Sequence, residues 1–511
     1  MRARSFRRAA LAPVVGLIAL CAAPAASADD PFFTAEPLMI TLSDPATSHA
    51  SAIISSGDEL GDFLFEGIPD GIGAMPGVDG SVEVFVNHEQ STVPFNNLAD
   101  FEMASISHLT LAPDGGVLDA SVALPDSAGF QRFCSATMAG PADGLSSYLY
   151  LTGEEAPDAL PVPAGAPYGP DPAYAPEDLR QSGYAVVLDP VTGEYTQVAG
   201  MGRHNHENVM VLPGAWDKIA IYSGDDTFTP PSSQLYLYLA EDEDAIWADE
   251  GNLLAFRVTH KNGVEVRPGD PFNGANDYGD VAAGDHLQGR FIRVPGWIAR
   301  GTTAREPQEA LERWSNRHNV FQFIRVEDTA YDPDVPLGGN PVMYVADTGS
   351  SSAVADPATG RLTSGSGGPF GNGRIFQMTF AKHDPRRVVD FSIVLDGNAS
   401  ENPLSPAPAM KNPDNLGISS DSLMIQEDVS SGFESRILRY DLNTAGLTVV
   451  AHVNTIGWES SGIVDASAFF GEGAWLLDVQ AHTVFVDQET VGDVTLKREA
   501  GQLILLHVDG S

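Results

Sequence analysis

Polar side chains that could bind metal ions follow short apolar runs at many points along the chain. The clusters include Asn87-His88-Glu89, Glu154-Glu155, His206-Glu207, Asp225-Asp226, Arg325-Val326-Glu327, Pro413-Asp414-Asn415, Glu427-Asp428 and Trp458-Glu459. Carboxylate oxygens are the ligands that hard cations such as calcium prefer. If the fold brings these carboxylates together, only cations could hold them side by side. The sequence therefore predicts a metal site assembled from distant segments.

An unpaired cysteine strengthens this prediction. Cys134 is the only cysteine beyond residue 28, and Glu154-Glu155 follows it by twenty residues. Exported proteins usually pair their cysteines in disulfides, so a single thiol is unusual in one. Two interpretations are open at this point, a buried inert thiol and a thiolate that binds a metal.

Familiar hydrolase motifs are missing from the sequence. It contains no phosphate-binding loop of the G-x-x-x-x-G-K type and no G-x-S-x-G nucleophile turn. His206-Glu207 does not begin a zinc-protease motif, because Met210 occupies the place of the second histidine. The candidate chemistry therefore rests on the acidic clusters and Cys134.

The elements that must position these residues are short strands. The chain has 51 Gly and 36 Pro but only 28 Lys plus Arg, which favours turns and strands over long helices. Strand-like runs recur throughout, among them Val82–Val86, Tyr148–Leu151, Ala185–Leu188, Leu235–Leu239, Met343–Val345 and Gln502–His507. Gly, Pro, Asp and Asn bound these runs, so we expect an all-β protein.

A repeated turn indicates how the strands are arranged. Asp189–Gly193 and Asp356–Gly360 share the pattern Asp-Pro-x-Thr-Gly, and Asp441–Gly446 is loosely similar. Their spacings of 167 and 85 residues are close to two to one, so a unit of about 84 residues would fit the chain six times. The sequence therefore predicts a six-bladed β-propeller with long inserted loops, whose corresponding strand ends converge on one axial face.

No linker to a second domain is visible, so we expect residues 29–511 to form a single β-propeller domain. Two stretches predict inserted loops, the proline-rich 156–180 and the Ser- and Gly-rich 349–373. One helix is predicted over Pro307–Asn316, where Leu311 and Trp314 can pack inward.

The first 28 residues predict a signal peptide. Four arginines precede an apolar run, and Ala26-Ser27-Ala28 supplies the small residues of a cleavage site. The run is short for a transmembrane helix, so we expect a periplasmic or extracellular monomer without stable membrane insertion. A net charge of −41 at pH 7 excludes nucleic acid as a partner, because its phosphates would be repelled.

The order of the clusters resembles the PhoX family of secreted alkaline phosphatases. The matching pieces are Asn87-His88-Glu89, Cys134 ahead of Glu154-Glu155, His206-Glu207 with Gly224-Asp225-Asp226, Arg325-x-Glu327, and Pro413-Asp414-Asn415-Leu416 ahead of Asp428. Ser135-Ala136-Thr137-Met138 replaces the glycines that usually follow the cysteine, as in a divergent branch. The resemblance implies a propeller that uses iron and calcium to hydrolyse phosphate monoesters.

The resemblance also implies roles for individual residues. The implied metal ligands are Cys134, Glu155, Glu207, Asp225, Glu327, Asn87 and Asp428. Cys134 would bind iron as a thiolate, whereas Asn87, Asp225 and Asp428 would lie on the calcium side. Arg325 would bind the phosphate oxygens, for which a planar guanidinium is well suited.

Other interpretations remain open for the site and for the whole chain. Asn87 and Asp225 could cap turns, and Arg325 could pair with a structural acid. The leading hypothesis is a secreted metal-dependent phosphomonoesterase that acts on a small phosphorylated substrate. The alternatives are a calcium-stabilised propeller that binds without catalysis and a propeller lactonase or phytase-like hydrolase.

Overall fold

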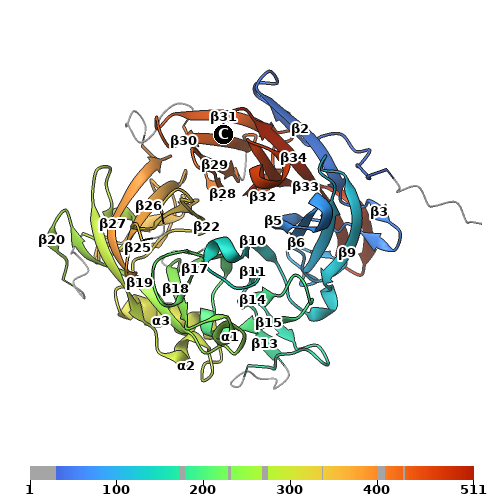
Figure 1. Ribbon diagram of the computed structural model, residues 1–511. Helices are drawn as coiled ribbons and strands as arrows, with labels where there is room; N and C mark the ends of the chain where they lie inside the picture. The colour runs from blue at the N-terminus through green and yellow to red at the C-terminus, as the bar shows by residue number, and fades with distance from the viewer. Residues whose placement is uncertain are drawn as a thin grey trace, which may run out of the picture. The chain divides into compact units, whose positions relative to one another are not determined.

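Antiparallel strands are the main regular elements of the chain and form sheets arranged in a ring (Figure 1). The computed structural model describes residues 30–171, 179–227, 229, 232–267, 274–336, 338–399, 409–429 and 432–510. Pro31–Ser511 form one compact unit. The predicted signal peptide, residues 1–28, lies outside the described residues.

Six four-stranded blades follow one another around the ring. Blade one contains β5 (Pro69–Pro76), β6 (Val82–His88), β8 (Ser105–Leu111) and β9 (Val117–Leu124). Blade two contains β10 (Phe133–Ala139), β11 (Leu149–Glu154), β14 (Ala185–Leu188) and β15 (Tyr195–Val198). Blade three contains β16 (His206–Val211), β17 (Ile219–Asp225), β18 (Leu235–Ala240) and β19 (Asn252–Lys261).

The second half of the ring repeats this order. Blade four contains β22 (Val326–Tyr331), β23 (Val342–Asp347), β26 (Arg374–Ala381) and β27 (Asp384–Asp396), and β21 (Leu287–Arg293) joins it to blade three. Blade five contains β28 (Pro413–Ile418), β29 (Ser422–Glu427), β30 (Arg436–Asp441) and β31 (Leu447–Val453), with β1 (Ile40–Leu42) added. Blade six contains β32 (Glu459–Asp465), β33 (Ala474–Val491), β34 (Val494–Val508) and β2 (Ser48–Ser55).

Shorter strands and helices lie outside the four main strands of each blade. The additional strands are β3 (Glu59–Leu60), β4 (Phe63–Leu64), β7 (Leu98–Asp100), β12 (Ala159–Pro161), β13 (Leu179–Gln181), β20 (Val264–Glu265), β24 (Ala353–Ala355) and β25 (Leu362–Ser364). The α-helices in the described residues are α1 (Glu243–Trp247), α2 (Gly296–Ala299), α3 (Pro307–Arg317) and α4 (Ser467–Phe470). The predicted helix is confirmed in α3, where Leu311 is buried. Across the described residues, no helix has the length and apolar character needed to span a membrane.

Both ends of the chain close the ring. The early strand β2 pairs antiparallel with β34, the last strand of the chain's described residues, so blade six is built from both (Figure 1). On the inside, β32 packs directly against β5 of blade one. Gly462 of β32 has a φ of 43°, and a Cβ there would lie 2.5 Å from the carbonyl oxygen of Asp70. This close approach requires glycine where the last blade meets the first.

Apolar clusters fill the spaces between neighbouring blades. Phe85 of blade one packs with Tyr150 of blade two, and Phe256 of blade three packs with Phe391 of blade four. Adjacent sheets therefore share a core in the face-to-face manner of packed β-sheets. This packing fixes the inner strands that carry the candidate site.

The predicted all-β, six-bladed propeller is confirmed, but the unit of about 84 residues is wrong. The first residues of successive inner strands are 64 residues apart between Pro69 and Phe133, and 120 apart between His206 and Val326. Insertions of unequal length cause this difference. The Asp356 turn also belongs to an inserted hairpin, β24–β25, rather than to the four strands of a blade.

Candidate metal centre

The same structural position in five blades supplies a side chain to one axial pocket. This position is the second residue of the inner strand, occupied by Asp70, Cys134, Glu207, Glu327 and Asp414. In all five blades the register between the inner and second strands shifts at this position. Such β-bulges re-aim side chains and are frequent beside active sites.

A second set of acids comes from the residues that directly follow the second strands. Glu89 follows β6, Glu155 follows β11, Asp226 follows β17 and Asp428 follows β29. Antiparallel pairing places the end of each second strand beside the start of its inner strand. Each blade can therefore contribute two neighbouring polar groups to the same end of the ring.

All of these positions except Asp226 line one cavity of about 320 Å³, the acid pocket. Its lining residues are Asp70, Glu89, Arg132, Cys134, Glu155, Glu207, Arg325, Glu327, Asp414, Asp428, Val429, Gly457, Glu459, Ser461 and His482. Eight carboxyl groups and one thiol thus face two arginines and one histidine. Protein cations are too few to balance these acids if all of them ionise.

Ligand atoms in the pocket fall into four overlapping groups, and within each group they lie within 4.8 Å of one another. The groups are Asp70–Glu89–Cys134, Cys134–Glu155–Glu207, Glu207–Glu327–Asp414 and Asp414–Asp428–Glu459. Cys134, Glu207 and Asp414 each belong to two groups. The arrangement is that of a row of cation positions that share bridging ligands.

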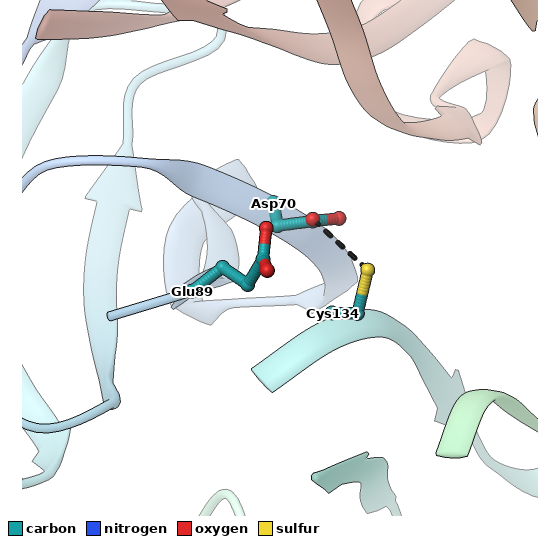
Figure 2. A group of neighbouring side chains, drawn as sticks. All are labelled: Asp70, Glu89 and Cys134. Carbon is teal, nitrogen blue, oxygen red and sulfur yellow. Dashed lines mark hydrogen bonds between the residues drawn. The ribbon is translucent and has the colours of Figure 1, made fainter. Parts of the chain in front are cut away.

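Cys134 lies between carboxylates of two blades. Figure 2 shows its sulfur beside Asp70 and Glu89, with Sγ 3.3 Å from Asp70 Oδ2. On its other side, Sγ lies 3.1 Å from Glu207 Oε1. Ser135 Oγ donates a hydrogen bond to Glu207 Oε1, and Asn415 Nδ2 donates to Ser135 Oγ. These contacts hold the thiol and Glu207 in fixed relative positions.

Burial makes deprotonation of these groups costly. Burial and the neighbouring Asp70 raise the pKa of Glu207 well above its usual range, and burial and Asp226 do the same for the pKa of Glu155. Burial, followed by Asp70 and Glu207, also raises the pKa of the Cys134 thiol. A cation would reverse this balance by stabilising the charged forms.

An unsatisfied oxygen atom shows that the residues fit bound cations. Glu207 Oε2 is buried and has no hydrogen-bond partner among the described residues. Buried polar atoms without partners are rare in folded proteins. A thiolate suits iron and carboxylates suit calcium, so the donor set is compatible with the two metals that the family resemblance implies.

Arg325 is anchored at the rim of the pocket. Its Nε donates to Asp226 Oδ1 at 2.8 Å, its Nη2 donates to Asp226 Oδ2 at 2.5 Å, and Glu327 Oε1 lies 2.9 Å from Nη2. Two-point pairing with Asp226 fixes the plane of the guanidinium. The side chain remains 21% exposed and lines the pocket.

The structure brings most of the predicted site residues together, but not all of them. Cys134, Glu155, Glu207, Glu327, Asp428 and Arg325 line the acid pocket. Asn87 lies deeper, where its Nδ2 donates to the Cys134 carbonyl oxygen and to Thr152 Oγ1. Asp225 accepts a hydrogen bond from Thr227 and lies outside the four ligand groups.

Several pocket residues were not predicted as ligands. They are Asp70, Glu89, Asp414, Glu459 and Arg132. Glu89, Asp414 and Glu459 belong to clusters that the sequence analysis named as possible metal-binding segments. Their positions beside strand ends could therefore have identified them as ligands. Asp70 lies in Pro69-Asp70-Gly71, which has the composition of a turn.

Comparison with known proteins agrees with this architecture. A family model described as alkaline phosphatase PhoX matches residues 142–486. The solved structure of Pseudomonas fluorescens PhoX in complex with vanadate is similar with a TM-score of 0.62 at 16% identity, covering 94% of this chain and 98% of that one. No curated protein sequence matches.

Two further solved structures are more distant. A protein of unknown function from Dyadobacter fermentans gives a TM-score of 0.34 at 7% identity, over 90% of this chain and 99% of that one. Zg3597, a family 117 glycoside hydrolase from Zobellia galactanivorans, gives a TM-score of 0.32 at 8% identity, over 91% of this chain and 90% of that one. Because the PhoX family model spans well over half of its residues, this chain belongs to the PhoX family of alkaline phosphatases, which are phosphoric monoester hydrolases.

Proposed function

We propose that the acid pocket binds iron together with calcium and hydrolyses small phosphate monoesters. The observation that carries the proposal is the convergence of eight carboxyl groups and one thiol in a single cavity of about 320 Å³. The Pseudomonas fluorescens structure contains vanadate, described as a transition-state analogue, which supports phosphoryl chemistry in the family.

The donor types suggest how the metals are distributed. Cys134, with Glu155 and Glu207, would hold iron, because it is the pocket's one sulfur donor. The carboxylates of the other three ligand groups would hold calcium. When bound, these cations supply Lewis acidity toward the phosphoryl group and lower the pKa of water.

The protein's own groups orient the substrate and the ligands. Arg325, fixed by Asp226, presents a guanidinium to the phosphate oxygens and balances part of their charge. Ser135 and Asn415 hold Glu207 in place through consecutive hydrogen bonds. His482 lies between Glu459 and Glu499 and fixes Glu459 at the pocket wall. Substrate would therefore enter a preorganised site.

We also infer that the protein works outside the cytoplasm as a monomer. The predicted signal peptide at residues 1–28 and the strongly acidic composition support an exported protein.

Hydrolysis of p-nitrophenyl phosphate tests the proposal. The metal-loaded protein should release p-nitrophenol, and Glu207→Gln should lower kcat/KM by about 100-fold or more, because it removes a ligand shared by two groups. Glu312→Gln is the matched control, since it neutralises a partly buried acid outside the pocket and should leave kcat/KM unchanged. A protein that binds calcium and iron but hydrolyses no phosphate ester would contradict the proposal and favour a binding module.

A further inference from the structure

A second cavity opens beside the acid pocket. It has a volume of about 300 Å³ and shares Glu89, Arg132 and His482 with the acid pocket as a common wall. Its other lining residues include the apolar Ile68, Val93, Phe95 and Leu98, together with the paired charges of Asp100, Lys497 and Glu499. We call it the Phe95 cavity. A molecule bound at the metals could extend directly into it.

A tight turn places Phe95 at the rim of this cavity. Phe95 and Leu98 exchange backbone hydrogen bonds of 2.8 and 2.9 Å, and Asn96 and Asn97 between them have φ values of 50° and 64°. Positive φ at both central positions is the geometry of a type I′ hairpin turn. The strand that follows, β7, pairs with β34 and anchors the turn to blade six. Phe95 is 68% exposed, although its position is fixed.

Arg132 stands where the two cavities meet. Its guanidinium makes no hydrogen bond and no ion pair within 4 Å with any described residue. Burial raises the pKa of Glu89, and the positive charge of Arg132 opposes that rise. In contrast, the other cations on the shared wall and in the Phe95 cavity are paired: His482 with Glu459 and Glu499, and Lys497 with Asp100.

The backbone of Arg132 is held in an unfavourable conformation. Its φ is 46°, in the left-handed region that disfavours residues with a Cβ. Hydrogen bonds fix it there, because Arg132 N donates to the Gln90 carbonyl and Glu155 N donates to the Arg132 carbonyl, each at 2.9 Å. Strain at a position that glycine would relieve points to a role for the side chain.

From these observations we propose that the Phe95 cavity is the leaving-group subsite and that Arg132 binds the phosphate from that side. This inference rests on the proposed function. The cavity would favour esters whose alcohol carries an apolar body of aromatic size, and Arg132 would contact a non-bridging oxygen of the phosphoryl group on the side of this body. Arg325 and Arg132 would then act on the phosphate group from different parts of the pocket wall.

Binding of non-hydrolysable phosphonates tests the subsite without relying on turnover. By calorimetry, the metal-loaded protein should bind 1-naphthylphosphonate more tightly than methylphosphonate. Phe95→Ala should reduce naphthylphosphonate affinity by about three- to ten-fold and leave methylphosphonate affinity unchanged, because only the aromatic contact is lost. Phe433→Ala is the matched control, because Phe433 is also exposed, at 56%, and lines a different cavity.

A glycine substitution separates the role of Arg132 from protein stability. Arg132→Gly should keep or raise the Tm, because glycine accepts the left-handed backbone conformation. The same variant should bind both phosphonates at least about ten-fold more weakly than the parent protein, because a contact to the phosphoryl oxygens is lost. Unchanged phosphonate affinity in Arg132→Gly would overturn the assignment of Arg132. An absent naphthyl preference, or one that persists in Phe95→Ala, would overturn the subsite. A protein that shows this preference but hydrolyses no phosphate ester would contradict only the proposed function.

Discussion

At the scale of single residues, Cys134 carries the most specific chemistry in the pocket. Its sulfur lies 3.3 Å from Asp70 Oδ2 and 3.1 Å from Glu207 Oε1, and it belongs to two ligand groups. Burial raises the pKa of this thiol, so a free thiol would stay protonated at neutral pH. A bound metal would deprotonate it, and an iron–thiolate bond absorbs visible light.

Replacement of Cys134 should therefore remove a colour. In Cys134→Ser the visible absorption of the native protein should disappear, and phosphomonoester hydrolysis should fall by at least about ten-fold because iron is held less tightly. Arg325→Ala should keep the absorption and weaken phosphate binding, since Arg325 faces the substrate. Absorption spectra and kinetics of the two variants provide the measurement. Full colour and full activity in Cys134→Ser would make this residue an ordinary buried thiol.

The sequence could predict those site residues whose neighbours have the composition of a strand end. Cys134, Glu207 and Glu327 each follow an apolar or histidine-containing cluster, and the structure places all three in the pocket. Asp70 was missed because Pro69-Asp70-Gly71 has the composition of a turn, whereas in the structure it opens the inner strand β5. The tertiary ring overrides this local preference.

At the scale of secondary elements, one strand register decides which acid reaches the axis. Asp225 ends β17 and Asp226 follows it, so alternation sends neighbouring side chains to opposite sides. Asp226 reaches Arg325 and Asp225 does not. The register shift of each inner strand depends on pairing with its neighbour, so the sequence alone could not fix this choice.

Helix α3 offers an independent pH test, because its Glu312 lies outside the acid pocket. Glu312 accepts hydrogen bonds from Gln234 and Asn316, and burial raises its pKa to about 7. The folded protein thus binds this proton more tightly than the unfolded chain. The contribution to stability is present below about pH 4.5 and is lost as pH rises through about 7.

Neutralising Glu312 should flatten this dependence. Between pH 5 and pH 8, the free energy of unfolding of Glu312→Gln should rise by up to about 3 kcal/mol relative to that of the parent protein, because the amide stays neutral and buries no charge. Urea unfolding of both proteins at the two pH values measures this difference. An equal loss of stability in parent and variant between these pH values would show that Glu312 does not titrate in this range.

At the scale of the whole molecule, the ring and its acids are coupled. Inner strands from all six blades pack in order around the axis, and five of them place an ionisable ligand in the same pocket. The carboxylates oppose closure of the ring when they ionise without cations. The fold and the metals should therefore stabilise one another.

Metal removal should lower the melting temperature. Dialysis against a chelator at pH 8 is expected to reduce the Tm by about 10 °C or more, and added calcium should restore most of the loss. Differential scanning calorimetry measures both steps, with dialysis against chelator-free buffer as the control. A melting curve that does not change in excess chelator would mean that the acids are ordinary solvated groups.

The propeller class could be predicted because turns and short strands dominate the composition. Blade boundaries could not, because insertions such as the hairpin β24–β25 lengthen some blades and not others. Pairing of β2 with β34 also joins segments more than 400 residues apart, and no local pattern signals that contact.

Elemental analysis of the protein purified from its native source tests the central claim most directly. We predict both iron and calcium, at more than one cation per chain, because the ligand groups form a row of four that share Cys134, Glu207 and Asp414. The double variant Glu207→Gln/Asp414→Asn should lose most of this metal, and Glu312→Gln should lose none. A native protein without tightly bound iron and calcium, or a double variant with the full complement, would contradict the account.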